Sequence, residues 1–271
     1  MLLCLKRWPM GYNTCRFIFC LCLAAGSAMA KTCPDVVLKS QIYKQSGPTC
    51  MVSAAVTAIG VRGRSPSVAD LARNLPIWKD GVHAYDLLVE LERRGWKGLS
   101  FTGPPEAAAR LVEVGFAAIA LVDGRTGRHA VTVTGRRRSR DSSGGCARRL
   151  DALQIVDSSS GRRHWMSAQA FADTQSNQQL LVFFTAAERR IIKASRFPLD
   201  IAERVDRRFR AHELYLRAKK HKRPNRQMLT LLKRAVVLDP CYARTRAMYH
   251  QVAHELNGQH DPIPVCQSGD R

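Results

Sequence analysis

The spacing of apolar side chains changes along this chain at Gly115. Before it, helical spacing predicts helices over 50–59, 68–76, 81–98 and 104–115. After it, short apolar or alternating runs predict strands over 116–123, 129–135, 150–158 and 179–184, with a short helix over 164–171. Helices followed by strands favour an α+β fold over an alternating α/β one.

The composition changes again near residue 186. Residues 189–204 are expected to form a linker, and 205–258 contain three further helical patterns. The ending, 259–271, is polar and is expected to be a loose tail. The sequence therefore predicts a small all-α domain after the mixed domain, which is expected over 31–188.

The N-terminus has the pattern of an export signal. Basic residues precede the apolar run FIFCLCLAAG, which is followed by SAMA ending at Ala30. The run is too short for a comfortable membrane span. We expect a signal peptide over 1–30 that is cut after Ala30, so that the mature chain is periplasmic or secreted and has no transmembrane domain. Retention as an N-terminal anchor is the alternative.

Export would place the cysteines in an oxidising compartment, which changes what their number predicts. The chain has nine cysteines, and an odd number of them, including Cys50, lies beyond Ala30. In an oxidising compartment, paired cysteines form disulfides and an unpaired one suggests a chemical role. The simplest accounting pairs Cys241 with Cys266 and Cys33 with Cys146, and leaves Cys50 free.

Cys50 follows a turn-forming Ser-Gly-Pro sequence and opens an apolar helix. A helix N-terminus lowers the pKa of a thiol and so favours the nucleophilic thiolate. Gln45, just upstream, is a candidate donor to an oxyanion, with Gln41 as the fallback. A buried, inert thiol is the competing interpretation of Cys50 alone.

Cysteine catalysis also needs a base and a group that orients it. His129 begins the strand pattern HAVTVTG, and Asp157 ends the strand pattern LQIVD. If these strands form a hairpin, the two side chains lie near the same end of the sheet. Cys50, His129 and Asp157 would then form a Cys-His-Asp triad in a papain-like arrangement. His164 is a weaker rival base, because it follows an expected turn.

The motifs QSGPTC, RHAVTVTG and LQIVDSSSG resemble those of the double-glycine leader peptidases, a family of papain-like cysteine peptidases. The resemblance covers about residues 38–185. It implies Gln45 as the oxyanion glutamine, Cys50 as the nucleophile, His129 as the base and Asp157 as its partner. Met51 and Ser158 depart from the family, which usually has glycine and proline there. LLKRAVVLDPCYA, in the C-terminal helices, resembles half of a tetratricopeptide repeat, which implies protein binding.

The net charge of +21 suggests acidic partners. Segment 136–149 is strongly basic and is expected to be a hairpin loop that is either simply solvated or in contact with an acidic surface. Nucleic acid is not favoured, because this segment lacks interleaved aromatic residues. No metal and no cofactor are expected.

These patterns leave three functions open. The first is an exported thiol peptidase that hydrolyses a peptide or protein substrate. The second is a catalytically degenerate scaffold that binds a protein. The third is an amidase or acyltransferase acting on cell-wall peptide.

Overall fold

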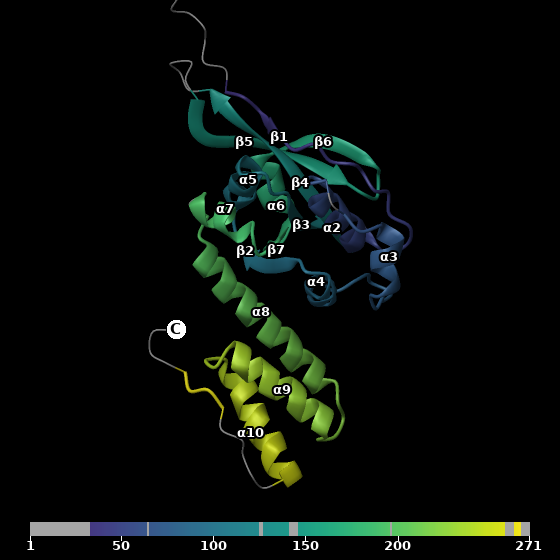
Figure 1. Cartoon of the computed structure of the whole chain (residues 1–271), viewed down its shortest axis with the longest axis vertical. Coiled ribbons are helices and arrows are strands. Elements are labelled where there is room, and N and C mark those ends of the chain that lie inside the picture. Colours follow the sequence, from purple (N-terminus) through teal and green to yellow (C-terminus); the bar gives the residue numbers. More distant parts are fainter. Residues whose placement is uncertain are drawn as a thin grey trace, which may run out of the picture.

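The structure, a computed structural model, describes residues 33–63, 65–124, 127–140, 146–195, 197–257 and 263–266. It contains an antiparallel sheet with helices on both faces, followed by a group of C-terminal helices (Figure 1). The α+β prediction is thus confirmed. The expected signal peptide lies outside the described residues. Within those ranges, no helix has both the length and the apolar character needed to cross a membrane.

The sheet has seven strands, and neighbouring strands are antiparallel. Their bounds are β1 Val36–Val37, β2 Lys97–Thr102, β3 Ala118–Gly124, β4 Gly127–Arg140, β5 Cys146–Asp157, β6 Arg162–Ser167 and β7 Gln175–Phe184. The order is β2-β7-β3-β4-β5-β6, and β1 pairs with β4. The last strand in sequence, β7, therefore lies between β2 and β3, and the sheet is not the simple meander that sequence order suggests.

Strand β2 was not predicted, because the helix expected over 81–98 covered its beginning. The helix is shorter, and the chain turns at Gly95, which has φ +87°. Four consecutive residues of β2 are buried, so the strand lacks the alternation that marks a half-exposed one. At Gly98 a Cβ atom would lie 2.3 Å from Leu88. Only glycine lets this strand pack so closely under the helix.

The basic segment 136–149 is mostly strand, and the expected loop is wrong for its described part. Strands β4 and β5 continue as a ribbon with Arg140 paired to Cys146. The arginines along β4 are held by carboxylates: Arg136 and Arg138 pair with Glu113, and Arg137 pairs with Asp35 and stacks on Trp165. Each of these three arginines thus has a carboxylate partner within the protein, although Arg136 and Arg138 share one. Contact of this segment with an acidic partner stays a prediction.

Helices cover both faces of the sheet. They are α2 Cys50–Gly60, α3 Val68–Arg73, α4 Ala84–Arg93, α5 Pro105–Glu113 and α6 Ala168–Thr174. Helices α2, α3 and α4 share one apolar core with Ile119 and Phe183, whereas α5 and α6 pack on the opposite face around Phe171. Ser67 caps α3 as expected, by accepting the Asp70 N–H.

The helix expected over 164–171 is only partly present. Its first residues belong to β6, which pairs with β5 through Ile155 and His164. The helix α6 begins after Ser167, whose hydroxyl accepts the Ala170 N–H. A polar strand at the sheet edge has weak apolar patterning, so its sequence does not reveal it.

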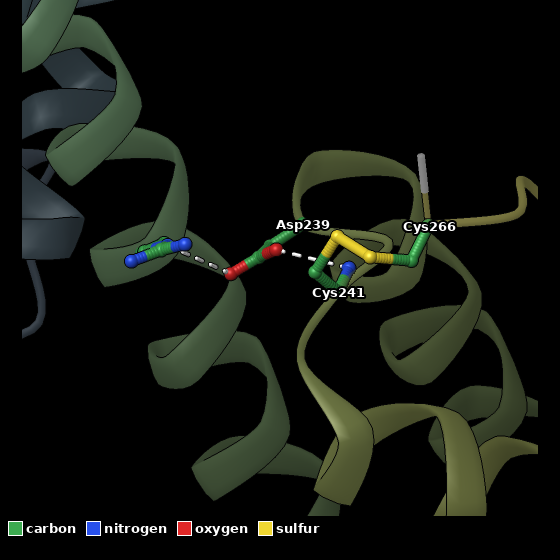
Figure 2. Close-up of a disulfide and its surroundings, with 4 residues drawn as sticks. Asp239, Cys241 and Cys266 are labelled. Atoms are coloured by element: carbon green, nitrogen blue, oxygen red, sulfur yellow. Dashed lines mark hydrogen bonds and ion pairs between the residues drawn. A yellow bond between two sulfur atoms is a disulfide. The ribbon is translucent and has the colours of Figure 1, made fainter. Parts of the chain in front are cut away.

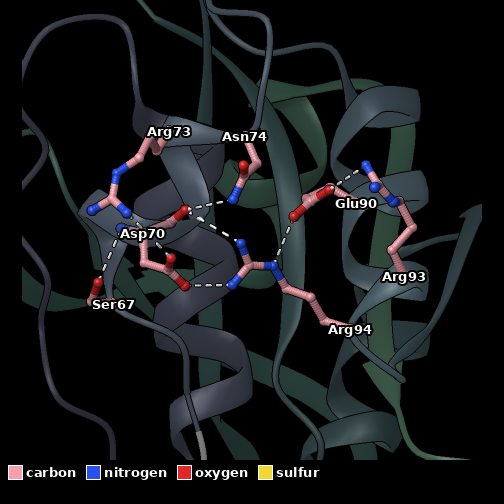
Figure 3. Close-up of polar contacts among 7 residues, drawn as sticks. All are labelled: Ser67, Asp70, Arg73, Asn74, Glu90, Arg93 and Arg94. Carbon is pink, nitrogen blue, oxygen red and sulfur yellow. Dashed lines mark hydrogen bonds and ion pairs between the residues drawn. The ribbon is translucent and has the colours of Figure 1, made fainter.

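A polar network joins α3 to α4 (Figure 3). The Arg94 guanidinium donates to Asp70 on α3 and, at 2.8 Å, to Glu90 on α4. The chain between the two helices turns through a small bridge from Trp78 to Gly81. The network therefore ties α3 to the C-terminal end of α4.

The C-terminal part consists of α7 Arg189–Ala194, α8 Leu199–Lys219, α9 Arg226–Leu238 and α10 Ala243–Asn257. The linker expected over 189–204 is largely helical instead. Its apolar side chains explain the difference, because Ile192, Phe197 and Leu199 are buried in the core of the sheet. Helix α8 leaves the sheet, and α9 and α10 lie beside its far half (Figure 1). The tetratricopeptide-like character of these helices stays a prediction.

A disulfide joins Cys241 to Cys266, as predicted (Figure 2). Asp239 accepts the Cys241 N–H at 3.1 Å and lies 3.6 Å from Arg208 on α8. The tail expected to be loose is therefore tied to the α9–α10 turn at Cys266. Cys33 is also disulfide-bonded. Its pairing with Cys146 stays a prediction.

Candidate active site

Cys50 is the first residue of α2, and a tight turn places it there. Gly47 has φ +65°, and the Thr49 hydroxyl donates to the Ser46 carbonyl at 2.9 Å. The first N–H groups of a helix have no partner within it and favour negative charge nearby. The predicted position of the thiol at a helix N-terminus is thus present. The rest of the helix is buried through Ile59, which holds it rigidly.

His129 and Asp157 come from adjacent strands of the sheet. The β4–β5 register pairs Thr132 with Val156, so His129 lies diagonally from Asp157 at one end of the sheet. The His129 Nε2 atom lies 2.7 Å from Asp157 Oδ1. Since the carboxylate can only accept, Nε2–H donates and Nδ1 is left for Cys50. The structure brings these three side chains together.

Asp157 is held as a carboxylate. Burial raises its pKa, but hydrogen bonds from Ser159, His129 and Ser160 outweigh burial and bring the pKa well below its usual range. Both the N–H and the hydroxyl of Ser159 donate to Oδ1, at 2.8 and 2.7 Å. A carboxylate with this many donors keeps its negative charge and fixes the imidazole ring.

The thiol and the imidazole shift each other's pKa in opposite directions. Burial raises the pKa of Cys50, but hydrogen bonds with His129 and with the Ala130 N–H, together with the His129 charge, lower it below the ordinary value. The hydrogen bond with Cys50 raises the pKa of His129; burial opposes this, and Asp157 adds to it. Both shifts favour a thiolate–imidazolium pair, the reactive form of a catalytic cysteine.

Gln45 lies beside the same end of the sheet. Its backbone N–H donates to the Ser158 carbonyl at 3.0 Å, and its side-chain carbonyl accepts from the Ser158 hydroxyl at 3.2 Å. Its amide nitrogen is 3.4 Å from the Gly47 carbonyl. Ser158, a departure from the resembled family, thus helps to hold Gln45. The fallback, Gln41, is exposed and accepts from Tyr43. The oxyanion role of Gln45 stays a prediction.

The acidity of the Cys50 thiol can be tested without a substrate. We expect His129→Ala to move the midpoint of iodoacetamide alkylation of Cys50 to higher pH, because the imidazole supplies both a hydrogen bond and a positive charge that lower the thiol pKa. The measurement is the alkylation rate against pH, followed by mass spectrometry of the Cys50 peptide. The matched control is His83→Ala, since His83 also lines the site cavity. An unchanged midpoint in His129→Ala would contradict the thiolate–imidazolium pair.

A cavity of about 320 Å³ opens beside the thiol. It is lined by residues of α2, the loop before α4, β3, β4, β7 and α8: Cys50, Met51, Asp80, Gly81, Val82, His83, Ala84, Leu121, Gly127, Arg128, Ala130, Gln179, Phe209 and Glu213. Larger cavities lie elsewhere among the described residues, but none of them is lined by a cysteine. The cavity that contains Cys50 is therefore the candidate substrate site.

Sequence reasoning missed two walls of this cavity. One is the loop Asp80–Ala84; the other is the pair Phe209 and Glu213 on α8, far along the chain in the expected all-α domain. Neither carries a motif. Only the packing of α8 against the sheet brings its side chains to Cys50, so no local pattern could have revealed them.

No protein-family model and no curated protein matches the sequence. Several solved structures are similar. A double glycine motif protease from an AMS/PCAT transporter, in complex with a leader peptide, is 15% identical, with 54% of this chain and 92% of that chain covered and a TM-score of 0.41. The peptidase domain of Streptococcus ComA, a bifunctional ABC transporter of a quorum-sensing pathway, is 19% identical, with 54% and 96% covered and a TM-score of 0.42.

A third similar structure is the N-terminal peptidase C39-like domain of a toxin secretion ATP-binding protein from Vibrio parahaemolyticus. It is 12% identical, with 52% of this chain and 98% of that chain covered and a TM-score of 0.35. All three are peptidase domains of the kind that the motifs of this chain resemble. At this level of likeness, the roles of Cys50, His129 and Asp157 rest on their own geometry.

Proposed function

We propose that this protein is an exported thiol peptidase that hydrolyses peptide bonds through Cys50, His129 and Asp157. One observation carries the proposal. A thiol at a helix N-terminus is hydrogen-bonded to a histidine, and that histidine is 2.7 Å from a carboxylate. A nucleophile, a base and an orienting group in one chain of hydrogen bonds are what acyl transfer from a peptide needs.

In the first half of the reaction, the Cys50 thiolate attacks the carbonyl carbon of the scissile peptide bond. The resulting oxyanion accepts hydrogen bonds from the Cys50 backbone N–H and from the Gln45 amide. The His129 imidazolium gives its Nδ1 proton to the leaving nitrogen as the carbon–nitrogen bond breaks. An amine departs, and the acyl group stays on Cys50 as a thioester.

In the second half, neutral His129 takes a proton from water, and the oxygen of that water attacks the thioester carbonyl. The carbon–sulfur bond breaks, the carboxylic product leaves, and the thiolate–imidazolium pair is restored. Asp157 keeps Nε2–H directed to itself throughout. It therefore holds the ring so that Nδ1 faces the sulfur in both halves.

The Cys241–Cys266 disulfide supports the exported location. Stable disulfides form and persist in oxidising compartments and are rare in the cytosol. Export through the signal sequence, with cleavage after Ala30, is part of the proposal. A peptide that is itself outside the cytoplasm is then the substrate class.

The two other candidate functions differ in what they require. A degenerate binding scaffold would be favoured by a wide separation of Cys50 from His129, and these side chains are instead in hydrogen-bond contact. An amidase or transferase acting on cell-wall peptide would use the same thiol with another acyl donor or acceptor. The products distinguish it from a peptidase.

Product analysis tests the proposed function. The protein is incubated separately with a mixture of unrelated peptides and with peptidoglycan fragments, and the products are identified by mass spectrometry. We expect new amino and carboxyl termini in the peptide mixture, and we expect prior alkylation by iodoacetamide to prevent them. Cleavage confined to the peptidoglycan fragments would assign the cell-wall activity instead. Intact substrates in both incubations would contradict hydrolysis at this site.

A further inference from the structure

Helix α8 forms one wall of the cavity that contains Cys50. Phe209 and Glu213, four residues apart on one face of the helix, both line this cavity. The same cavity is lined by Cys50 and Met51 at the start of α2 and by Asp80 on the loop before α4. Part of the candidate substrate site thus comes from outside the region that carries the nucleophile, the base and the orienting carboxylate.

Polar contacts on both sides of Glu213 hold α8 in place. On the N-terminal side, Asp206 accepts the Ser100 N–H of β2 at 2.8 Å, and Arg210 donates to the Gly98 carbonyl at 2.9 Å. On the C-terminal side, Arg217 pairs with Asp86 of α4 at 2.7 Å. Since the helix is tied at both ends of this stretch, Glu213 has a defined position against the cavity.

Glu213 has no ion pair or hydrogen bond among the residues that the structure describes, although the chain carries a net charge of +21. Two arginines on its own helix are within one turn of it. Arg210 is committed to Asp206 and Glu92, and Arg217 is committed to Asp86 and to the ring of Tyr85. A half-buried carboxylate thus lines the cavity, while the two arginines within one turn of it on α8 are engaged elsewhere.

The other charged groups of the cavity are Asp80, Arg128 and His83. Asp80 also lacks an ion pair within the described ranges, so it adds a second negative charge. Arg128 is exposed, and the β3–β4 register sets it opposite Asp123. The interior wall formed by α8 is therefore acidic, and it also presents the aromatic ring of Phe209.

We propose that Glu213 and Phe209, with Asp80 across the cavity, form a specificity subsite for a lysine or arginine side chain of the peptide substrate. This inference rests on the proposed peptidase function. Glu213 binds the cationic group by charge-assisted hydrogen bonds, and Phe209 packs against the aliphatic stem or below the cation. Because Cys50 lines the same cavity, the basic residue lies close to the scissile bond.

The test uses peptidyl acyloxymethyl ketones, which alkylate a catalytic cysteine after binding as peptides. Three probes differ only in carrying arginine, norleucine or glutamate at one of the two residues before the reactive group. The measurement is the second-order rate of labelling at Cys50 in the full chain. We expect the arginine probe to label the wild-type protein on the order of 10- to 100-fold faster than the norleucine probe, the usual effect of a hydrogen-bonded charge pair.

Three variants distinguish the loss of the subsite from a general loss of folding or of Cys50 reactivity. Glu213→Gln should lose the preference for arginine over norleucine, and Glu213→Lys should shift the preference toward glutamate. Asp200→Asn is the matched control, because it removes the same charge from α8 outside the cavity. It should leave all three rates unchanged, and a cooperative thermal unfolding transition like that of the wild type shows that each variant is folded.

The outcomes keep the two proposals distinct. Equal labelling of wild-type Cys50 by all three probes, or an arginine preference that survives in Glu213→Gln, would overturn the subsite and leave the peptidase proposal standing. A Cys50 that iodoacetamide alkylates but no peptidyl probe labels would overturn the peptidase proposal, and the subsite with it.

Discussion

Cys50→Ala is expected to abolish labelling by a thiol-directed peptidase probe and to reduce peptide hydrolysis by on the order of 10³-fold or more. The expectation follows from the site chemistry. The thiolate forms the bond that splits the reaction into two steps, and no other side chain in the described part of the cavity can replace it. Labelling is measured by mass spectrometry of the intact protein, and hydrolysis by release of products from the peptide mixture.

Ser53→Ala is the matched control for this variant. Ser53 lies on the same helix, one turn after Cys50, and its buried hydroxyl has no hydrogen-bond partner in the described structure. Its removal should leave labelling and hydrolysis as they are in the wild type. Label in Cys50→Ala equal to that in the wild type would show that the reactive thiol is elsewhere, and the proposed mechanism would be wrong.

Arg210→Ala is expected to lower the free energy of unfolding by about 3–5 kcal/mol, the usual cost of removing one partner of a buried ion pair. The Arg210 side chain is 11% exposed and that of Asp206 is 7% exposed. Arg210 binds Asp206, Glu92 and the Gly98 carbonyl together, so its loss leaves buried acceptors on both sides of the α8–β2 contact. Chemical denaturation of the full chain measures the change.

Arg207→Ala is the control, because Arg207 is an exposed arginine on the same helix and should contribute within about 0.5 kcal/mol. Replacing Arg210 and Asp206 together by apolar residues should cost less than Arg210→Ala alone, since no unpaired carboxylate is then buried at Asp206. If Arg210→Ala matched Arg207→Ala in stability, the ion pairs would not be what holds α8 against the sheet.

The convergence of Cys50, His129 and Asp157 could be predicted from sequence because each of these residues lies at a local signal. Cys50 follows a turn and opens an Ala-rich helix, and both His129 and Asp157 lie at ends of apolar strand patterns. A hairpin pairing then brings the strand ends together with no further information. The acidic wall could not be predicted, because Glu213 has the sequence context of any solvated helix residue. Only the docking of α8 distinguishes it.

The errors in the fold prediction have the same origin. The expected linker over 189–204 is rich in charged residues. Its apolar side chains Phe197 and Leu199 nevertheless pack into a core formed by residues that are distant in sequence. The basic segment after Gly135 has the sequence of a loop, but Glu113 and Asp35, which are distant in sequence, pair with the arginines of its first strand. Strand β2 is not evident from the sequence because its four middle residues are all buried and so show no alternation. In each case tertiary contacts override a local pattern.

The position of β7 has a consequence for the order in which this protein folds. Phe184 at the end of β7 pairs with Lys97, and Leu181 pairs with Ile119, so the middle of the sheet closes only through contacts across long stretches of chain. Pairings of such sequence separation form late and slow the folding rate. While the chain is still being synthesised, Cys50 would be present before the sheet that supports α2 is complete. The cluster of Cys50, His129 and Asp157 would then rest on a complete sheet only after β7, the strand that follows all three residues, has been inserted.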